Sequence, residues 1–373
     1  MEKDLGLAEW EISIVSASFL FVYAVMQVPA GMLLDRYRPR LLLPPMAIGV
    51  AAAALMLSAA TGFWSAVAAR ALMGIFAAFA FPGAGLVARR RLPVAQFAIA
   101  MGLIDMAFGF GGWIGLTGVE FLMQWQSWRA VMVDLAIIGG IVAVLCFVCI
   151  SNTTARGNVA TESARSRSMI QSMREVLGVR QVRLAAVTAG TLMAVLFGFG
   201  GLWDVPLQQA FGYGHGEAVT LNGWIFIGAA IMPPIVGWAA DRWRIRRPIL
   251  MGGMVFALIA ALAILLVPGH GPQWQPTLML LALGLGIGTC VLTFPIACDA
   301  VDPANVGAAI GVVNAAGLLS AAMFQIVPGA IFAAIGSQSL LIMQVVLAIF
   351  VVGLLIGLWA TWQMDRCPRT SKA

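Results

Sequence analysis

The first long apolar segment of the chain ends in GMLLDRYRPR, residues Gly31–Arg40. A near copy, GWAADRWRIRR, ends another apolar segment at Gly237–Arg247, so the pattern G-x-x-x-D-R-x-x-x-R recurs 206 residues later. The glycine lets a neighbouring helix approach, the aspartate can pair with an arginine, and the basic cluster suits the anionic face of a bilayer. Because both copies follow the end of an apolar segment, they predict that the chain has two related halves. A single copy could have been merely the charged residues that flank one membrane helix.

The composition places most of the chain in lipid. Of its 373 residues, 61% are hydrophobic and 10% are charged, and the mean hydropathy is +0.95. Soluble domains carry roughly 25% charged residues, so the soluble classes of protein are excluded. We expect an all-α membrane protein, because a helix satisfies its own backbone groups in lipid.

Eleven segments are long and apolar enough to cross a bilayer, for which about 20 helical residues suffice. The expected spans are Ile12–Leu34, Leu41–Ala60, Phe63–Ala88, Val94–Gly118, Ala130–Ile150, Leu184–Trp203, Val219–Ala240, Pro248–Val267, Pro276–Cys298, Val306–Ala334 and Ser339–Trp362.

The basic residues lie almost entirely on one side of these spans. Alternate loops hold 19 of the 22 lysines and arginines, which by the positive-inside rule makes that side cytoplasmic. We therefore expect a multi-pass protein of the bacterial inner membrane with a cytoplasmic C-terminus. The same loops account for the net charge of +6, and no nucleic-acid partner is expected.

One long polar loop divides the spans into five and six. We expect an N-terminal bundle at residues 1–150, a cytoplasmic linker at 151–183 that is helical around Met169–Leu177, and a C-terminal bundle at 184–373. The linker is rich in Ser, Thr and Arg, a composition typical of a hydrated connection between domains.

The repeated loops resemble those of the major facilitator superfamily of transporters, whose loop between helices 2 and 3 has the form G-x-x-x-D-R/K-x-G-R/K-R/K. Arg38 and Arg244 stand where that family has a glycine after the D-R pair. Arg70 and Gly74 resemble the family's R-x-x-x-G element in helix 4, and the likeness extends over essentially the whole chain, most closely to proteobacterial members of unassigned substrate. The gating residues that the resemblance implies are Gly31, Asp35, Arg36, Arg40, Gly237, Asp241, Arg242 and Arg246.

The resemblance implies the family's fold of two pseudo-symmetric six-helix bundles. Two spans precede the second motif, Leu184–Trp203 and Val219–Ala240, but only Ile12–Leu34 precedes the first. We therefore expect the eleven spans to be the equivalents of helices 2–12, with the first helix missing through an internal start or a truncated gene. A genuine eleven-span protein is the alternative.

The resemblance also implies a substrate cavity between the bundles, lined by helices 1, 4, 7 and 10. Ionisable residues inside spans are costly and therefore mark function. Arg70 is a candidate for substrate or proton coupling, or else forms a structural pair. Asp105 is a candidate proton carrier, or else the counter-charge of Arg70. The neutral polar candidates, which could instead bond between helices, are Thr191, Asn222, Thr289, Thr293, Asn314 and Gln325.

These residues favour a monomeric secondary transporter that moves a small solute, anionic if Arg70 binds it, by alternating access coupled to a proton gradient. Two alternatives stay open: a drug or metabolite efflux antiporter, suggested by Gly102, Gly111 and Gly115, and a non-transporting remnant or sensor. We expect no enzyme activity, cofactor or metal, because the sequence has no P-loop and no clustered acids, histidines or metal ligands.

Overall fold

The computed structural model describes residues 2–37, 39–91, 94–150, 169–243, 245–266, 273–302 and 305–364. Over these residues the regular structure is entirely helical. Eleven stretches of this described part are long and apolar enough to cross a membrane. The predicted all-α membrane fold with eleven spans is therefore confirmed.

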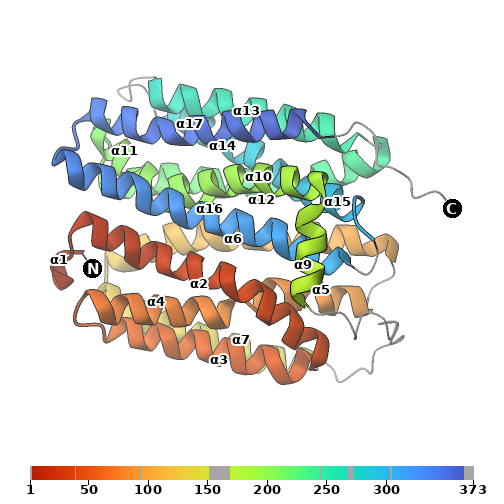
Figure 1. Ribbon diagram of the computed structural model, residues 1–373. Helices are drawn as coiled ribbons and strands as arrows, with labels where there is room; N and C mark the ends of the chain where they lie inside the picture. Colours follow the sequence, from red (N-terminus) through yellow and green to blue (C-terminus); the bar gives the residue numbers. More distant parts are fainter. Residues whose placement is uncertain are drawn as a thin grey trace.

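The first half of the chain forms the helices drawn from red to yellow in Figure 1. Their bounds are α1 (Glu2–Leu5), α2 (Glu9–Arg36), α3 (Pro39–Ser58), α4 (Phe63–Ala77), α5 (Ala80–Arg91), α6 (Val94–Met123) and α7 (Trp128–Cys149). The expected span Phe63–Ala88 is not one regular helix, because a turn at Ala78 and Phe79 separates α4 from α5.

The second half includes two helices that change their hydrogen-bonding pattern inside a span. η1 is π-helical and η2 is a 3₁₀ segment. The bounds are α9 (Met169–Gly178), α10 (Arg180–Met193), η1 (Ala194–Trp203), α11 (Asp204–Ala210), α12 (His215–Trp243), α13 (Arg246–Leu266), α14 (Trp274–Ile287), η2 (Gly288–Leu292), α15 (Thr293–Cys298), α16 (Val306–Ile335) and α17 (Leu340–Trp362).

The loop between the halves is described only in part. Residues 151–168 of the expected linker lie outside the described residues. The helix expected at the end of the linker is α9, which lies across the ends of the other helices in Figure 1.

Helices pack in the same order within each half. In the first half α2 contacts α4, α4 contacts α3, and α3 contacts α7; in the second half α12 contacts α14, α14 contacts α13, and α13 contacts α17. In Figure 1 the second-half helices α10, α12, α13 and α17 lie above the first-half helices α2, α3, α4 and α7. The second half also has α10 and η1, packed against α16 and α17.

Two helix pairs join the halves, α2 with α16 and α6 with α12. Small residues make the second pair close: a methyl group added to Gly109 would lie 2.6 Å from the Cβ of Ala230. In the first pair, Gly329 of α16 faces Ser13 of α2 in the same way. Near the basic loops the spacing changes, because Gly31 and Gly311 have open space where a side chain would lie.

Packing inside the second half depends on a backbone contact between α12 and α14. A methyl group on Gly284 would lie 2.1 Å from the carbonyl oxygen of Ile225 and 3.0 Å from the Cα of Gly228. Neither neighbour is a side chain that can rotate away. Only glycine at both places therefore lets the two helices cross this closely.

We predict that Gly284→Ala lowers the thermal unfolding temperature of the purified protein, with a loss of roughly 1–3 kcal/mol from overpacking. Gly252→Ala is the matched control, because Gly252 lies in α13 with open space around it. The unfolding temperature of that control should equal or slightly exceed that of the native protein, since alanine stabilises a helix more than glycine does. Equal unfolding temperatures for the two variants would contradict the role assigned to Gly284.

Candidate functional site

A cavity of about 200 Å³ lies where the helices of the two halves meet. Its walls come from the bundle-joining helices α2, α6, α12 and α16, and from the α4–α5, α10–η1 and α14–η2–α15 spans. The lining residues are Phe19, Leu20, Tyr23, Phe81, Asp105, Phe108, Gly109, Met193, Leu196, Phe197, Ala229, Pro233, Ile287, Gly288, Cys290, Val291, Phe294, Asn314 and Leu318. The expected contributions of helices 4, 7 and 10 are therefore present, and the four joining helices add to them.

The cavity is lined mainly by aromatic and aliphatic side chains. Six of its residues are aromatic: Phe19, Tyr23, Phe81, Phe108, Phe197 and Phe294. Phe108 of α6 meets Phe197 of η1 edge-on, with ring centroids 5.6 Å apart, so this pair crosses from one half to the other. Apolar walls with few polar groups are typical of small-molecule sites.

Asp105 is the one charged residue in this lining, and Asn314 is its one amide. Asp105 lies on α6 and Asn314 on α16, so the two halves each contribute one polar group. In the described part of the chain, no ion pair joins Asp105 to Arg70. The expectation that Arg70 is its counter-charge is therefore not met.

Arg70 and Gly74 lie one turn apart on α4 and both face α2. The Arg70 guanidinium donates to the carbonyl oxygen of Ser16 at 3.4 Å and lies over the ring of Phe19, 4.9 Å from its centroid. A methyl group on Gly74 would lie 2.6 Å from the carbonyl oxygen of Phe19. These two residues therefore hold α2 against α4, and Arg70 lies behind a cavity residue rather than among the lining residues.

The other neutral polar candidates bond to backbone carbonyls rather than line the cavity. Thr191, Thr289 and Thr293 each donate to the carbonyl three residues earlier in the chain, at 2.7–3.0 Å. Asn222 donates to Gly200 at 2.7 Å and Gln325 donates to Phe197 at 2.6 Å, both across helices. Asn314 alone among the six lines the cavity.

The residues expected to gate the cavity lie at the end of the helices that carries the basic loops. Gly31 and Gly237 have open space beside them. Arg40 lies over the Phe147 ring, 4.6 Å from its centroid, and Arg246 pairs with Asp299. Arg242 is exposed, while the side chains of Asp35, Arg36 and Asp241 lie outside the described residues.

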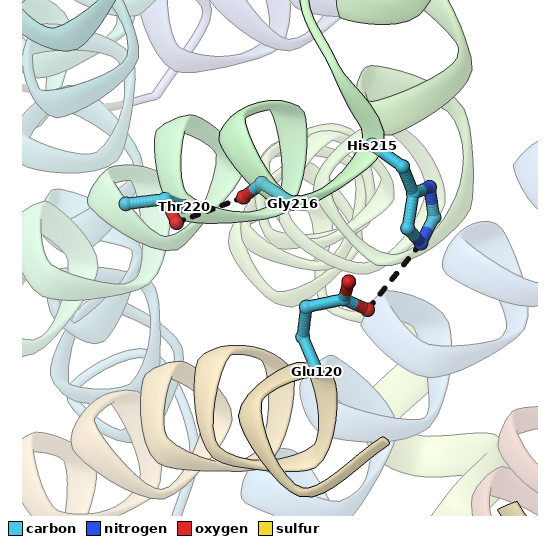
Figure 2. A network of polar contacts seen from close by, with 4 residues as sticks. All are labelled: Glu120, His215, Gly216 and Thr220. Carbon is cyan, nitrogen blue, oxygen red and sulfur yellow. Dashed lines mark hydrogen bonds and ion pairs between the residues drawn. The ribbon is translucent and has the colours of Figure 1, made fainter. Parts of the chain in front are cut away.

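The opposite end of the α6–α12 pair has an ion pair between the halves. Figure 2 shows Glu120 near the end of α6 beside His215, the first residue of α12. The carboxylate Oε2 lies 3.3 Å from the imidazole Nε2, a pair that carries opposite charges when His215 is protonated. Thr220 donates to the Gly216 carbonyl within the same first turns of α12.

Two titratable groups lie near this ion pair, Glu217 in the first turn of α12 and Tyr213 in the turn before α12. Glu217 accepts hydrogen bonds from the Gly214 N–H at 3.1 Å and from Gln273 at 2.9 Å. Burial, and then the charge of Glu217, raise the pKa of the nearby Tyr213 phenol. Tyr213 therefore stays uncharged, and the Glu120 carboxylate and the His215 imidazole form the polar contact between the halves at this end.

Sequence reasoning missed the aromatic lining and one buried acid. The sequence alone does not show whether an aromatic side chain inside an apolar span lines a cavity, faces lipid or packs against another helix. Asp204 is fully buried at the start of α11, but the expected span ended one residue earlier, at Trp203. A hydropathy window extended past the tryptophan would have included Asp204 as an intramembrane acid.

Known transporters resemble the chain over part or most of its length. A probable actinorhodin transporter of Streptomyces coelicolor is 26% identical over 407 aligned positions, covering 91% of this chain and 69% of that protein. A D-galactonate transporter of Escherichia coli is 29% identical over 151 residues, 39% of this chain and 34% of its own. The chain thus spans about a third of the second relative's length.

Solved structures share the fold at low sequence identity. A bacterial homolog of the human lysosomal transporter Spinster, in an inward-facing and occupied conformation, superposes with a TM-score of 0.72 at 15% identity, covering 100% of this chain and 93% of that one. A variant of the nucleoside transporter NupG gives a TM-score of 0.74 at 12% identity, covering 98% and 93%. The family model described as the Major Facilitator Superfamily matches residues 1–324 and, in a second alignment, 205–373. These matches cover the whole sequence, and the chain belongs to the Major Facilitator Superfamily.

Proposed function

We propose that this chain is a secondary transporter that moves a small solute across the bacterial inner membrane by alternating access, coupled to protons through Asp105. The observation that carries the proposal is the cavity between the halves, with Asp105 as the one carboxyl group among the described residues of a mainly apolar lining. A carboxyl group in such surroundings needs a proton or a cation when no basic side chain faces it. Exchange of that proton against the solute links the two movements.

The first candidate substrate class is an apolar or aromatic solute with a basic or hydrogen-bonding group. Six aromatic residues line the cavity, and their rings offer stacking and cation–π contacts. Asp105 and Asn314 then supply the polar contacts that orient the solute. This class agrees with the efflux alternative that Gly102, Gly111 and Gly115 of α6 suggest.

The second candidate class is an organic anion. Two relatives favour it by their names: a D-galactonate transporter of Escherichia coli and a probable galactarate/D-glucarate transporter of Bacillus subtilis. The alignment with this chain covers about a third of the length of each relative. Within this chain its support is Arg70, which lies against the cavity residue Phe19. An anion would need Phe19 to move before it could reach the guanidinium.

We assign the moving parts to residues 1–150 and 184–373, with 151–183 as the connecting linker. The joining pairs support this division, because α2 with α16 and α6 with α12 are the long contacts between the halves. They also support the numbering of α2–α7 as the equivalents of helices 2–6. On that numbering the second helix of each half meets the fifth helix of the other, and α10 with η1 is the helix without a counterpart.

The burial of α6 agrees with this numbering. Only 6% of the most apolar part of α6 is buried, against 39% for that of α16, its equivalent in the second half. In the second half α10 covers α16.

We predict that Asp105→Asn abolishes accumulation driven by a pH gradient in proteoliposomes and leaves solute exchange at equal pH intact. The amide keeps the shape of the carboxyl group but cannot carry a proton. The substrate screen should include aromatic amines, neutral aromatic compounds, galactonate, glucarate and sulfoacetate.

Asp134→Asn is the matched control, because this acid lies in α7 and accepts a hydrogen bond from Gln126 outside the cavity. It should accumulate solute at the native rate. Native accumulation by Asp105→Asn would refute proton coupling at this residue. A native chain that moves no compound of the screen would favour the non-transporting alternative.

We predict that the Glu120–His215 pair stabilises the state closed at its end of the molecule. Spin labels at the exposed residues Gln124 and Gln209 should report longer distances in Glu120→Gln and in His215→Gln. The double variant should open no further than either single variant, because one contact is lost in all three. Additive opening would mean that the two residues act independently.

We also predict that Asp35→Asn lowers the transport rate while membrane insertion stays normal. The proposed role of the Asp35 and Asp241 loops is to latch the cytoplasmic side through ion pairs with neighbouring arginines. Asp241→Asn should have a similar effect, since the second loop repeats the first. Unchanged uptake in proteoliposomes at equal protein content would reject the latch.

A further inference from the structure

Asp204 is a fully buried acid within a membrane span, and it lies outside the cavity lining. It begins α11, directly after η1, in the span Arg180–Ala210, and none of its surface is exposed. Its Oδ1 accepts a hydrogen bond from the Gln208 amide at 3.0 Å. Its Oδ2 is buried and has no hydrogen-bond partner.

Lysine and arginine are absent from long stretches of the C-terminal half. The sequence contains neither from Leu184 to Ala240 or from Pro248 to Trp362. The elements that pack most extensively against α11 are η1, α12 and α17, and η1 and α17 contain no titratable residue.

The titratable groups of α12 lie at its two ends. His215 and Glu217 are exposed in its first turn, where His215 faces Glu120 and Glu217 accepts from Gly214 and Gln273. Asp241 and Arg242 lie in its last turn. Tyr213, in the turn before α12, is uncharged. Asp204 therefore has no counter-charge among the described groups of these elements.

An ionised carboxylate in this position would cost several kcal/mol, because burial removes its hydration and nothing charged replaces it. The single amide of Gln208 satisfies one oxygen only. The remaining oxygen needs either a bound proton or a bound metal cation.

Two further buried oxygens near η1 also lack donors. Asn222 and Gln325 give their amide hydrogens to the Gly200 and Phe197 carbonyls of η1, which leaves their own side-chain oxygens, Oδ1 and Oε1, without a partner. With Asp204 Oδ2, three unpartnered acceptors come from η1–α11 and the two helices beside it. Of these three acceptors only Asp204 Oδ2 carries a charge when ionised, and a buried carboxylate oxygen without a donor suits a proton or a small hard cation.

We propose that Asp204 is a buried binding site for a small monovalent cation, a proton or Na⁺, distinct from Asp105 in the cavity. Seven residues separate Asp204 from the cavity residue Phe197, roughly 10 Å along a helix axis. The site deepens the proposed function, on which it rests for the role of a coupling ion. Its occupancy by a cation follows from burial alone and can be measured without transport.

The first measurement is the infrared spectrum of the reconstituted native protein compared with Asp204→Asn. If the ligand is a proton, the native spectrum contains a protonated-carboxyl C=O band that Asp204→Asn lacks and that NaCl does not change. Asp105→Asn is the control, since it should keep the Asp204 band and lose the C=O band of the Asp105 carboxyl group.

The second measurement is the unfolding temperature in NaCl compared with choline chloride at equal ionic strength. If the ligand is Na⁺, the native protein and Asp105→Asn unfold at a higher temperature in NaCl, and Asp204→Asn shows no such rise. Asp204→Asn should fold, because the amide removes the buried charge and keeps the shape.

An ionised Asp204 in the native spectrum, together with no effect of Na⁺ on unfolding, would overturn the site. If Asp204→Asn fails to fold, the carboxyl band and the Na⁺ response that remain in Asp105→Asn carry the test. If the chain transports solute but shows neither the carboxyl band nor the Na⁺ effect, the Asp204 site is refuted and the proposed function is not. If it shows one of these signals but transports no solute, the proposed function is refuted and the site is not.

Discussion

The close contact between α6 and α12 fixes where the two halves meet, and other features follow from it. Both helices contribute glycines to this contact: Gly109 and Gly112 of α6 face Ala230 and the Phe226 ring, and Gly223 of α12 faces the Trp113 ring. Each glycine gives room to a larger group on the other helix, so along most of its length the pair interlocks through apolar contacts. In lipid such close packing supplies the association that the hydrophobic effect provides in water.

The cavity exists because this interlocking is not repeated everywhere between the halves. On the cavity side α6 presents Asp105 and Phe108, and η1 presents Phe197, whose ring meets Phe108 edge-on. Rings that touch at their edges leave space beside them that aliphatic side chains would fill. The resulting volume is mostly apolar, and Asp105 is the one carboxyl group among the described lining residues, which makes its protonation state decisive for what the cavity can hold.

The sequence predicts the spans well because hydropathy reflects the dominant physical constraint on the chain. It predicts Asp105 for the same reason, since a charge inside an apolar helix stands out. It does not predict the roles of Thr289 and Thr293, whose hydroxyls bond to carbonyls in the preceding turn. A small polar side chain can satisfy itself within its own helix, so its presence in a span does not indicate a pathway. Phe19, Phe81 and Phe294 are missed because their position on a cavity wall depends on helix rotation, which span boundaries do not determine.

The π-helical segment η1 shows why that rotation matters. Phe197 and Asp204 are seven residues apart, close to two full turns of a regular α-helix, so a regular helix would place both on one face. The wider turns of a π-helix rotate later residues relative to earlier ones, and Phe197 lines the cavity while Asp204 does not. The same segment leaves the Phe197 and Gly200 carbonyls to accept from Gln325 and Asn222. One irregular stretch therefore separates an aromatic wall from a buried acid and provides the polar contacts that hold the neighbouring helices in place.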